Sequence, residues 1–175
     1  MKLSHTFIDT SIVGSDIPST ISFDEDYLNN PEFQEILNKY LYDLPLFSKI
    51  VDKGMSKTKR KCRLYYRESE FIGYIIYVDN FMSFKEDRQF LGFDKGGFFE
   101  TININDIEIR ESIRKNKSNP RYGNILMNTF ISEMQNEWYD GITLQGNSEW
   151  HISYYEKTYG FLDLKDGGNA MILWF

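Results

Sequence analysis

The chain has 175 residues, a formal net charge of −6 and an aromatic content of 17%. This length is typical of one domain with a real core, and the aromatic content excludes a disordered chain. The single cysteine, Cys62, excludes an intrachain disulfide, and one cysteine with two histidines is too few for a zinc cage, so we expect no metal site. The acidic balance disfavours a dedicated DNA or RNA binder, and we expect no nucleic-acid partner.

The sequence has neither a secretory leader nor an apolar run long enough to cross a membrane. Its lone cysteine fits a reducing compartment. We therefore expect a cytoplasmic protein without a membrane partner.

The first sixty residues predict short strands and helices. Apolar residues in 7–13 and in Thr20–Phe23 are compatible with two short strands. Asn30 before Pro31 predicts a helix start, with Asn30 as the N-cap. One helical face of the residues that follow is apolar: Phe33, Ile36, Leu37, Tyr40, Leu41 and Leu44. Residues 46–53 predict a second short helix.

The basic segment Lys57–Arg63 has two interpretations. It fits a nucleic-acid or acidic-lipid patch, but a solvated loop running into a strand is the more common structure for so short a run, and we favour that. Leu64–Tyr66 continues the strand, and Glu68-Ser69 is typical of a turn. Phe71–Asp79 is apolar on both parities, which predicts a central strand paired with the first as an antiparallel hairpin.

The stretch Thr101–Ile109 predicts a strand with an irregularity. Ile102 and Ile104 share one parity of the strand, whereas Ile107 and Ile109 share the other. A β-bulge at Asn105-Asp106 would restore the phase, and a polar strand end without a bulge is the alternative.

A basic loop, Arg110–Arg121, follows this strand and precedes a predicted helix, Gly123–Trp138. A loop at a helix N-terminus offers free N–H groups and suits an anion. The helix carries an apolar stripe of Leu126, Met127, Phe130, Ile131, Met134 and Trp138. A short strand, Gly141–Gln145, a helix capped by Asn147 or Ser148, and a terminal hairpin of Phe161–Leu164 with Met171–Phe175 complete the chain.

This order of elements, together with Asn147, Tyr155-Glu156-Lys157 and Gly160-Phe161, resembles the GNAT-type N-acetyltransferases over roughly residue 62 to the C-terminus. The resemblance implies an α+β (mixed α/β) fold: a central mixed, mostly antiparallel sheet with a bulged, splayed strand, flanked by helices. We expect a single acyltransferase-like domain over residues 1–175, with a divergent helical part in 1–60 and a cofactor-binding core in 61–175.

The loop departs from the pattern of the family. Gly123 takes the last glycine position of the phosphate loop, but Arg121 stands where an earlier glycine is expected. The leading arginine of the family is best matched by Arg114, and the intervening loop is longer. Direct charge from Arg114, Lys115, Lys117 and Arg121 would compensate for the missing glycine.

The resemblance implies acetyl-CoA as the cosubstrate and assigns roles to individual residues. Tyr155 would be the general acid for the leaving thiolate, and Glu108 the general base for the amine. The expected cofactor contacts are Ile107, Glu108, Ile109, Arg114, Arg121, Tyr122, Gly123, Asn124 and Asn147. Asp106, Glu100 and His151 remain alternatives for the base, and Tyr154 and Tyr155 remain open to a purely structural role.

The leading interpretation is an acetyl-CoA-dependent N-acetyltransferase. Its acceptor would be an amine of a small molecule or of a protein or peptide, and a homodimer is compatible with the sequence. The alternative is a non-catalytic CoA-binding or regulatory module with the same fold, which the altered phosphate loop favours.

Overall fold

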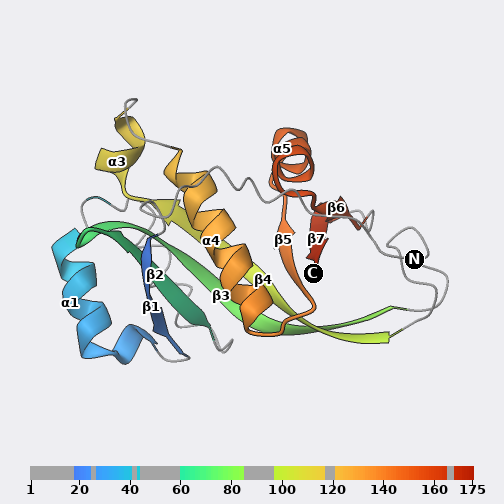
Figure 1. Ribbon diagram of the computed structural model, residues 1–175, viewed down its shortest axis with the longest axis horizontal. Coiled ribbons are helices and arrows are strands. Elements are labelled where there is room, and N and C mark those ends of the chain that lie inside the picture. Colours follow the sequence, from blue (N-terminus) through green and yellow to red (C-terminus); the bar gives the residue numbers. More distant parts are fainter. Residues whose placement is uncertain are drawn as a thin grey trace. The chain divides into compact units, whose positions relative to one another are not determined.

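The computed structural model has a mixed α+β fold, as expected (Figure 1). Hydrogen bonds join seven strands in the order β1-β2-β3-β4-β5-β7-β6. The structure describes residues 18–24, 27–40, 43, 60–84, 97–116, 121–164 and 168–175. Within these residues, no helix is long and apolar enough to cross a membrane.

The strands are β1 (Ser19–Phe23), β2 (Lys61–Arg67), β3 (Glu70–Phe84), β4 (Gly97–Ile109), β5 (Gly141–Gln145), β6 (Leu162–Asp163) and β7 (Ala170–Trp174). The helices are η1 (Tyr27–Asn29), α1 (Pro31–Tyr40), α3 (Glu111–Lys115), α4 (Tyr122–Asn136) and α5 (Glu149–Tyr159). The β4–β5 pair is parallel, and the β1–β2, β2–β3, β5–β7 and β6–β7 pairs are antiparallel.

The chain forms two compact units. One unit, here called the Glu108 unit, comprises Ile12–Val78 and Asn105–Phe130. The other, the Tyr155 unit, comprises Met1–Ser11, Asp79–Ile104 and Ile131–Phe175. The predicted single domain over residues 1–175 stays a prediction, and each unit is described by itself below.

The Glu108 unit is built on the predicted hairpin of β2 and β3. Glu68 and Ser69 form its turn with positive φ angles of 48° and 71°, as the sequence indicated. A register shift between Tyr65 and Tyr66 puts a bulge in β2. Helix α1 begins as predicted, because the Asn30 side chain accepts hydrogen bonds from the N–H groups of Glu32 (2.9 Å) and Phe33 (3.2 Å).

The face of this hairpin that packs with α1 is an apolar core. Phe33 and Leu37 come from α1, and Phe23 comes from β1. Cys62, Leu64, Phe71, Tyr74 and Ile76 come from the hairpin itself. The apolar spacing along α1 therefore predicted the buried face of this helix correctly.

The Tyr155 unit contains the β5–β7–β6 part of the sheet and helix α5. The parallel register pairs Thr101–Asn103 of β4 with Gly141–Thr143 of β5. The predicted terminal hairpin is confirmed, since Leu162 and Asp163 pair with Ile172 and Met171. Ser148, not Asn147, caps α5, and Gly160 ends it in the left-handed conformation with φ of 80°.

Two predicted elements differ from the structure. The stretch Arg110–Arg121 is not all loop, because Glu111–Lys115 forms the short helix α3, held by an ion pair between Glu111 and Lys115 one turn apart. Trp138 does not continue the apolar stripe of α4. The helix ends at Asn136, and Trp138 lies beyond it with a positive φ and is 89% exposed.

The burial pattern of β4 keeps one phase. Ile102, Ile104 and Glu108 share a parity and are all buried, whereas Ile107 and Ile109 are half-buried on the other parity. Two apolar faces account for the pattern without an extra residue, because a strand covered on both sides carries apolar side chains on both parities. A bulge at Asn105-Asp106 stays a prediction. The predicted strand in 7–13 and the predicted helix in 46–53 lie outside the described residues.

Candidate functional site

Glu108 lies near the end of β4 in the Glu108 unit, and its carboxyl group is buried. Its side chain is only 5% exposed, and its Oε1 lies 3.4 Å from the Arg114 guanidinium of α3. Burial raises the pKa of the Glu108 carboxyl, and the charge of Arg114 opposes that rise. A carboxyl whose pKa is raised toward neutrality is a better general base than a solvated one.

Asp106, the alternative base, is half-buried on the same parity of β4. The Tyr74 hydroxyl donates a hydrogen bond of 3.4 Å to its Oδ2. The charge of Asp106 also contributes to raising the pKa of Glu108, after burial. The remaining alternatives are less suitable. Glu100 is exposed, and His151 is held at the start of α5, where its Nδ1 lies 2.8 Å from the Ser148 hydroxyl.

Glu108 is placed by a close approach of two strands. A Cβ atom on Gly73 of β3 would lie 2.2 Å from the backbone oxygen of Glu108 and 3.1 Å from the Cα of Ile109. No side chain fits there, so only glycine lets β3 and β4 come this near. The backbone of Ile107, Glu108 and Ile109 was expected to bind the pantetheine arm, and this role stays a prediction.

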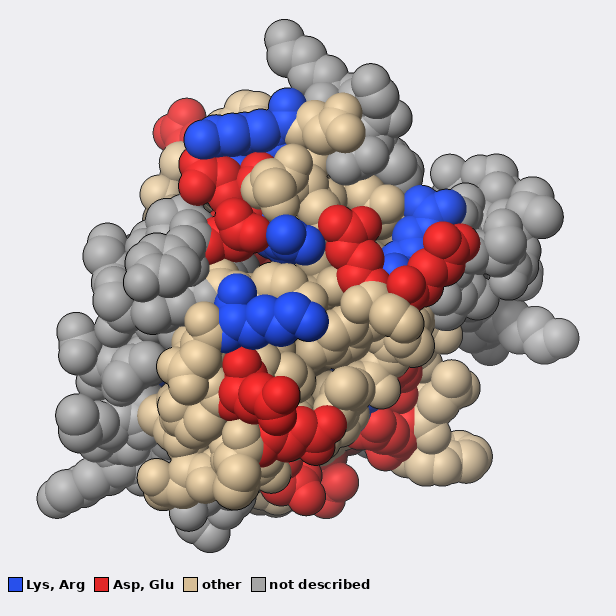
Figure 2. Space-filling view, turned by 90° about the vertical axis from the view of Figure 1, so that its left-hand side faces the viewer, with Lys and Arg blue, Asp and Glu red and all other residues tan. Residues whose placement is uncertain are grey.

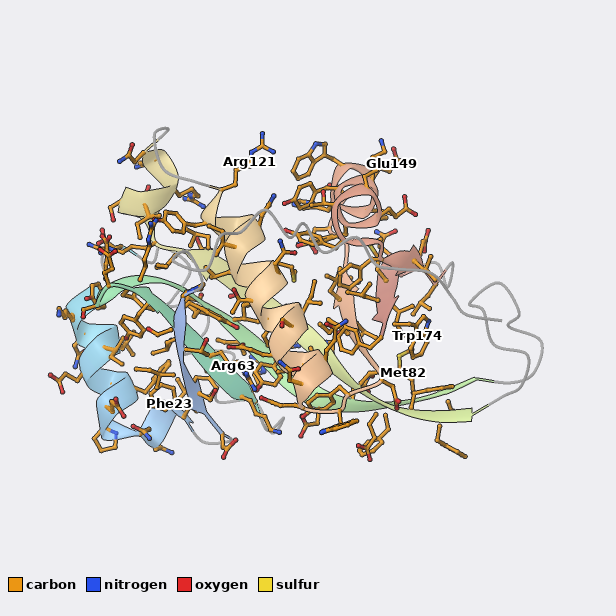
Figure 3. The ribbon with its side chains drawn as sticks, viewed as in Figure 1. Phe23, Arg63, Met82, Arg121, Glu149 and Trp174 are labelled. Atoms are coloured by element: carbon orange, nitrogen blue, oxygen red, sulfur yellow. The ribbon has the colours of Figure 1, made fainter. Side chains whose placement is uncertain are left out.

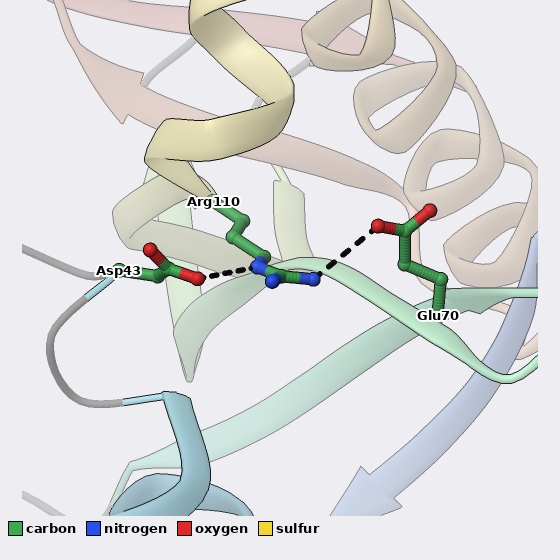
Figure 4. A network of polar contacts seen from close by, with 3 residues as sticks. All are labelled: Asp43, Glu70 and Arg110. Carbon is green, nitrogen blue, oxygen red and sulfur yellow. Dashed lines mark hydrogen bonds and ion pairs between the residues drawn. The ribbon is translucent and has the colours of Figure 1, made fainter.

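Arg110 ties the end of β4 to its surroundings. Its Nε lies 2.7 Å from Asp43 Oδ2 and its Nη1 lies 3.3 Å from Glu70 Oε1 (Figure 4). Its guanidinium also lies over the Tyr40 ring, 5.1 Å from the centroid, and its N–H bonds the Ile72 carbonyl. These contacts fix the point where β4 ends and α3 begins, which is where Glu108 and Arg114 are attached. Nothing in the sequence pattern indicated this cluster.

The predicted phosphate-binding cations divide into two groups. Arg114 pairs with Glu108, and Lys115 pairs with Glu111, so both are already offset by carboxylates. Arg121 is exposed, its side chain extends away from the start of α4 (Figure 3), and it forms no ion pair with a described residue. Lys117 lies outside the described residues. On the face drawn in Figure 2, the coloured Lys and Arg side chains lie among Asp and Glu side chains.

The start of α4 has room for a ligand. A Cβ atom on Gly123 would meet nothing within 4 Å, and its N–H has no partner among the described residues. The N–H groups of Asn124 and Ile125 instead bond the Arg121 carbonyl, at 2.9 and 3.2 Å. The Tyr122 hydroxyl accepts a hydrogen bond of 2.9 Å from Arg67 of β2, which anchors this end of the helix.

Tyr155 lies on α5 in the Tyr155 unit, within an aromatic cluster. Its ring contacts Tyr154, Tyr159 and Phe161 at centroid distances of 5.5, 6.1 and 5.7 Å. Burial, followed by the neighbouring Tyr154, raises the pKa of the Tyr155 phenol, so it stays protonated at neutral pH. Its hydroxyl forms no hydrogen bond with a described residue, whereas the Tyr154 hydroxyl lies 3.2 Å from that of Tyr159. Asn147, another expected contact, is exposed ahead of α5.

No protein-family model and no curated protein sequence matches the chain. Among solved structures it is similar to AtaTR bound with acetyl-CoA (TM-score 0.47, 14% identity, 88% of this chain and 92% of that one). It is also similar to the KacTA–DNA complex (0.46, 12%, 89% and 92%) and to AtaT complexed with acetyl-methionyl-tRNAfMet (0.44, 11%, 89% and 95%).

AtaT and KacT are GNAT-type toxin acetyltransferases, so the similarity agrees with the family resemblance of the sequence. The TM-scores are below 0.5, and the function below is therefore derived from the residues of this chain. One expectation is corrected. The exclusion of a nucleic-acid partner does not stand, because the similar structures include a DNA complex and a tRNA complex.

Proposed function

We propose that this protein is an acetyl-CoA-dependent N-acetyltransferase whose acceptor is a primary amine. The buried Glu108 carboxyl, with its raised pKa, is the observation that carries the proposal. An alkylamine with a pKa of about 10.4 is protonated at neutral pH and must lose a proton before it can attack a thioester. Glu108 supplies the base for that proton, directly or through a water molecule.

The transfer requires one base and one acid. The amine nitrogen forms a bond to the acetyl carbon as the carbon–sulfur bond breaks, and the proton of the nitrogen goes to Glu108. The leaving sulfur takes a proton from the Tyr155 hydroxyl. That hydroxyl suits the role because its raised pKa keeps it protonated and no described residue holds it in a hydrogen bond.

The start of α4 fits the diphosphate of the cosubstrate. Gly123 leaves space for close approach, its N–H points out of the first helical turn, and Arg121 adds a positive charge that no described carboxylate offsets. Arg114 is a weaker candidate for this role than the sequence implied, because its guanidinium lies against Glu108. We assign Arg121 and the Gly123 N–H to the diphosphate and Arg114 to Glu108.

The test is transfer with wild type and Glu108→Gln. Wild type is incubated with acetyl-CoA and a panel of small amines, peptides and an aminoacylated tRNA, and free CoA and acetylated acceptor are both quantified. We expect kcat/KM to fall by roughly 10²–10⁴-fold in Glu108→Gln, with CoA affinity retained. Glu35→Gln, an exposed change on α1, is the matched control and should keep full activity. An unaltered kcat/KM in Glu108→Gln removes Glu108 from the mechanism.

A second candidate is a CoA-binding or regulatory module without turnover. The observation in its favour is the engagement of Arg114 and Lys115 with carboxylates, which leaves a sparse set of phosphate ligands. Tight CoA binding without any acetylated acceptor across the panel would favour this candidate over the enzyme.

A further inference from the structure

A group of polar side chains lies within the apolar core that α1 covers in the Glu108 unit. Tyr27, Cys62 and Tyr74 are buried members of this core, and the Tyr74 hydroxyl reaches Asp106 of β4. We call Tyr27, Arg60, Cys62, Tyr74 and Asp106 the Tyr27 cluster. Burial, with the charges of its neighbours, raises the pKa values of Tyr27, Cys62 and Tyr74, so all three stay neutral.

Two donors in this cluster are buried without a partner. Tyr27 is 3% exposed, and its hydroxyl has no hydrogen-bond partner among the described residues. The Nε of Arg60 is likewise buried and without a hydrogen-bond partner among the described residues. A buried donor left unsatisfied is costly and rare in native proteins, so each such group requires an explanation.

The unsatisfied groups act on one another and on Asp106. The pKa of the Tyr27 phenol is raised by burial first and then by Cys62, is lowered by Arg60, and is raised by Asp106. The Tyr27 ring itself is well packed, edge-on to Phe33 at a centroid distance of 4.9 Å. The ring thus has a structural reason to be here, whereas its hydroxyl has none within the described part of the fold.

The chemistry of the cluster suits a molecule with two kinds of polar group. A Tyr O–H and an Arg Nε–H both donate, and they match an oxygen that accepts hydrogen bonds. A carboxylate has about four acceptor sites, of which the Tyr74 hydroxyl uses one of those on Asp106, and it matches an ammonium group. Asp106 lies two residues before Glu108 on the same parity of β4.

We infer that the Tyr27 cluster is an acceptor subsite, in which Tyr27 and Arg60 bind an oxygen of the acceptor while Asp106 faces its amine. The inference rests on the proposed function. It narrows the acceptor to amines that carry an accepting oxygen close to the nitrogen, as opposed to plain alkylamines. The oxygen can be a hydroxyl, a carbonyl or a carboxylate, and the experiment distinguishes these.

The probes are ethanolamine, glycinamide and glycine, which present those three oxygens, and propylamine, in which a methyl group replaces the hydroxyl of ethanolamine. Dissociation constants are measured by NMR titration without acetyl-CoA, so the result does not depend on turnover. We expect at least one oxygen-bearing probe to bind wild type about tenfold more tightly than propylamine, as for one well-made hydrogen bond. We expect Tyr27→Phe to abolish that difference.

Tyr40→Phe is the matched control, because Tyr40 also packs against this core and its hydroxyl forms no hydrogen bond with a described residue. It should leave the preference unchanged. The melting temperature is a second readout that a structural hydroxyl would move the other way. Deleting an unsatisfied buried hydroxyl should leave the melting temperature of Tyr27→Phe unchanged or raise it by about 2–4 °C.

Three results would overturn the inference: equal binding of propylamine and every oxygen-bearing probe, retention of the preference in Tyr27→Phe, or no binding of any probe. A lowered melting temperature in Tyr27→Phe would also overturn it, because the hydroxyl would then have an internal partner such as a trapped water. Failure of the proposed function is distinct: it would show as absent acetyl transfer or absent CoA binding, whatever the probes do.

Discussion

The hydroxyl groups of Tyr154 and Tyr159 lie 3.2 Å apart, one turn of α5 from each other, and this contact separates the roles of two adjacent tyrosines. Tyr154 is occupied by Tyr159 and stacks on the exposed Trp150 with an interplanar angle of 6°. Tyr155 is packed through its ring alone, and no described residue holds its hydroxyl. The sequence left both tyrosines open to either role, and the structure favours Tyr155 as the proton donor.

Tyr155→Phe should reduce kcat by roughly 10²–10⁴-fold, because it keeps the ring and removes the proton that the leaving sulfur takes. CoA affinity and melting temperature should stay at wild-type values, since the hydroxyl makes no internal contact that folding depends on. The measurements are steady-state kinetics, CoA titration and thermal unfolding of the same preparation.

Tyr154→Phe is the matched comparison and should give the opposite pattern. Loss of its hydrogen bond to Tyr159 should destabilise the fold by about 0.5–1.5 kcal/mol, while turnover is largely kept. If Tyr154→Phe abolishes turnover and Tyr155→Phe does not, the assignment of the acid is off by one residue.

The stability of Glu108→Gln relative to wild type should depend on pH. The fold raises the pKa of Glu108 above its ordinary value of about 4.3, chiefly through burial, with Arg114 opposing the rise. A raised carboxyl pKa stabilises the folded state below the unfolded pKa, and that contribution is lost as pH rises through the folded pKa. The free energy of unfolding of Glu108→Gln should therefore gain on wild type between about pH 4 and pH 8.

Urea unfolding at about pH 4, 6 and 8 measures this difference directly. Glu35→Gln, at an exposed position of α1, should run parallel to wild type. A difference that shrinks as pH rises would mean that the pairing with Arg114 outweighs burial and lowers the pKa of Glu108, which would remove the reason for choosing it as the base.

Arg121→Glu should weaken CoA binding, because it reverses the one charge in the described phosphate region that no carboxylate offsets. In wild type, CoA at about 100 times its dissociation constant should stabilise the fold by roughly 2.7 kcal/mol, a rise of very roughly 5–10 °C in melting temperature. The rise should largely disappear in Arg121→Glu at the same CoA concentration.

Lys157→Glu makes the same change of charge at an exposed position on α5 and should keep the full thermal shift. Equal shifts in wild type and Arg121→Glu would place the diphosphate elsewhere, and the alignment of the loop with the family pattern would then be wrong.

Gly73→Ala should destabilise the Glu108 unit, because the new Cβ would lie 2.2 Å from the Glu108 backbone oxygen and β4 would have to move. We expect a loss of about 1–3 kcal/mol and, since Glu108 moves with its strand, a lower kcat/KM. Gly123→Ala is the control for stability. Its Cβ meets nothing within 4 Å, so the change should keep or raise the melting temperature. Wild-type stability of Gly73→Ala would contradict the close approach of the two strands.

Local sequence signals predicted several elements correctly. The Asn30-Pro31 pair predicted the start of α1, the Glu68-Ser69 turn predicted the β2–β3 hairpin, and Gly160 marked the end of α5. In each case the signal is a local preference of the backbone, which tertiary packing did not need to override.

Features that depend on distant partners could not be predicted. Trp138 continues the apolar period of α4, yet it lies outside the helix and is exposed, because period alone does not fix where a helix ends. Arg114 was expected to bind phosphate and instead lies against Glu108. The unsatisfied Tyr27 hydroxyl had no sequence signal, since a tyrosine in an apolar region is ordinarily satisfied. The signal for α3 existed in the Glu111–Lys115 pair and was read as loop.

Quantifying both products of one reaction tests the central claim most directly. Wild-type protein, acetyl-CoA and the amine panel are incubated, and free CoA and acetylated acceptor are measured by mass spectrometry in the same samples. The account predicts equal amounts of the two products with at least one amine, lost together in Glu108→Gln and Tyr155→Phe and kept in Glu35→Gln. Formation of free CoA without acetylated acceptor, or equal product from wild type and both variants, would contradict it.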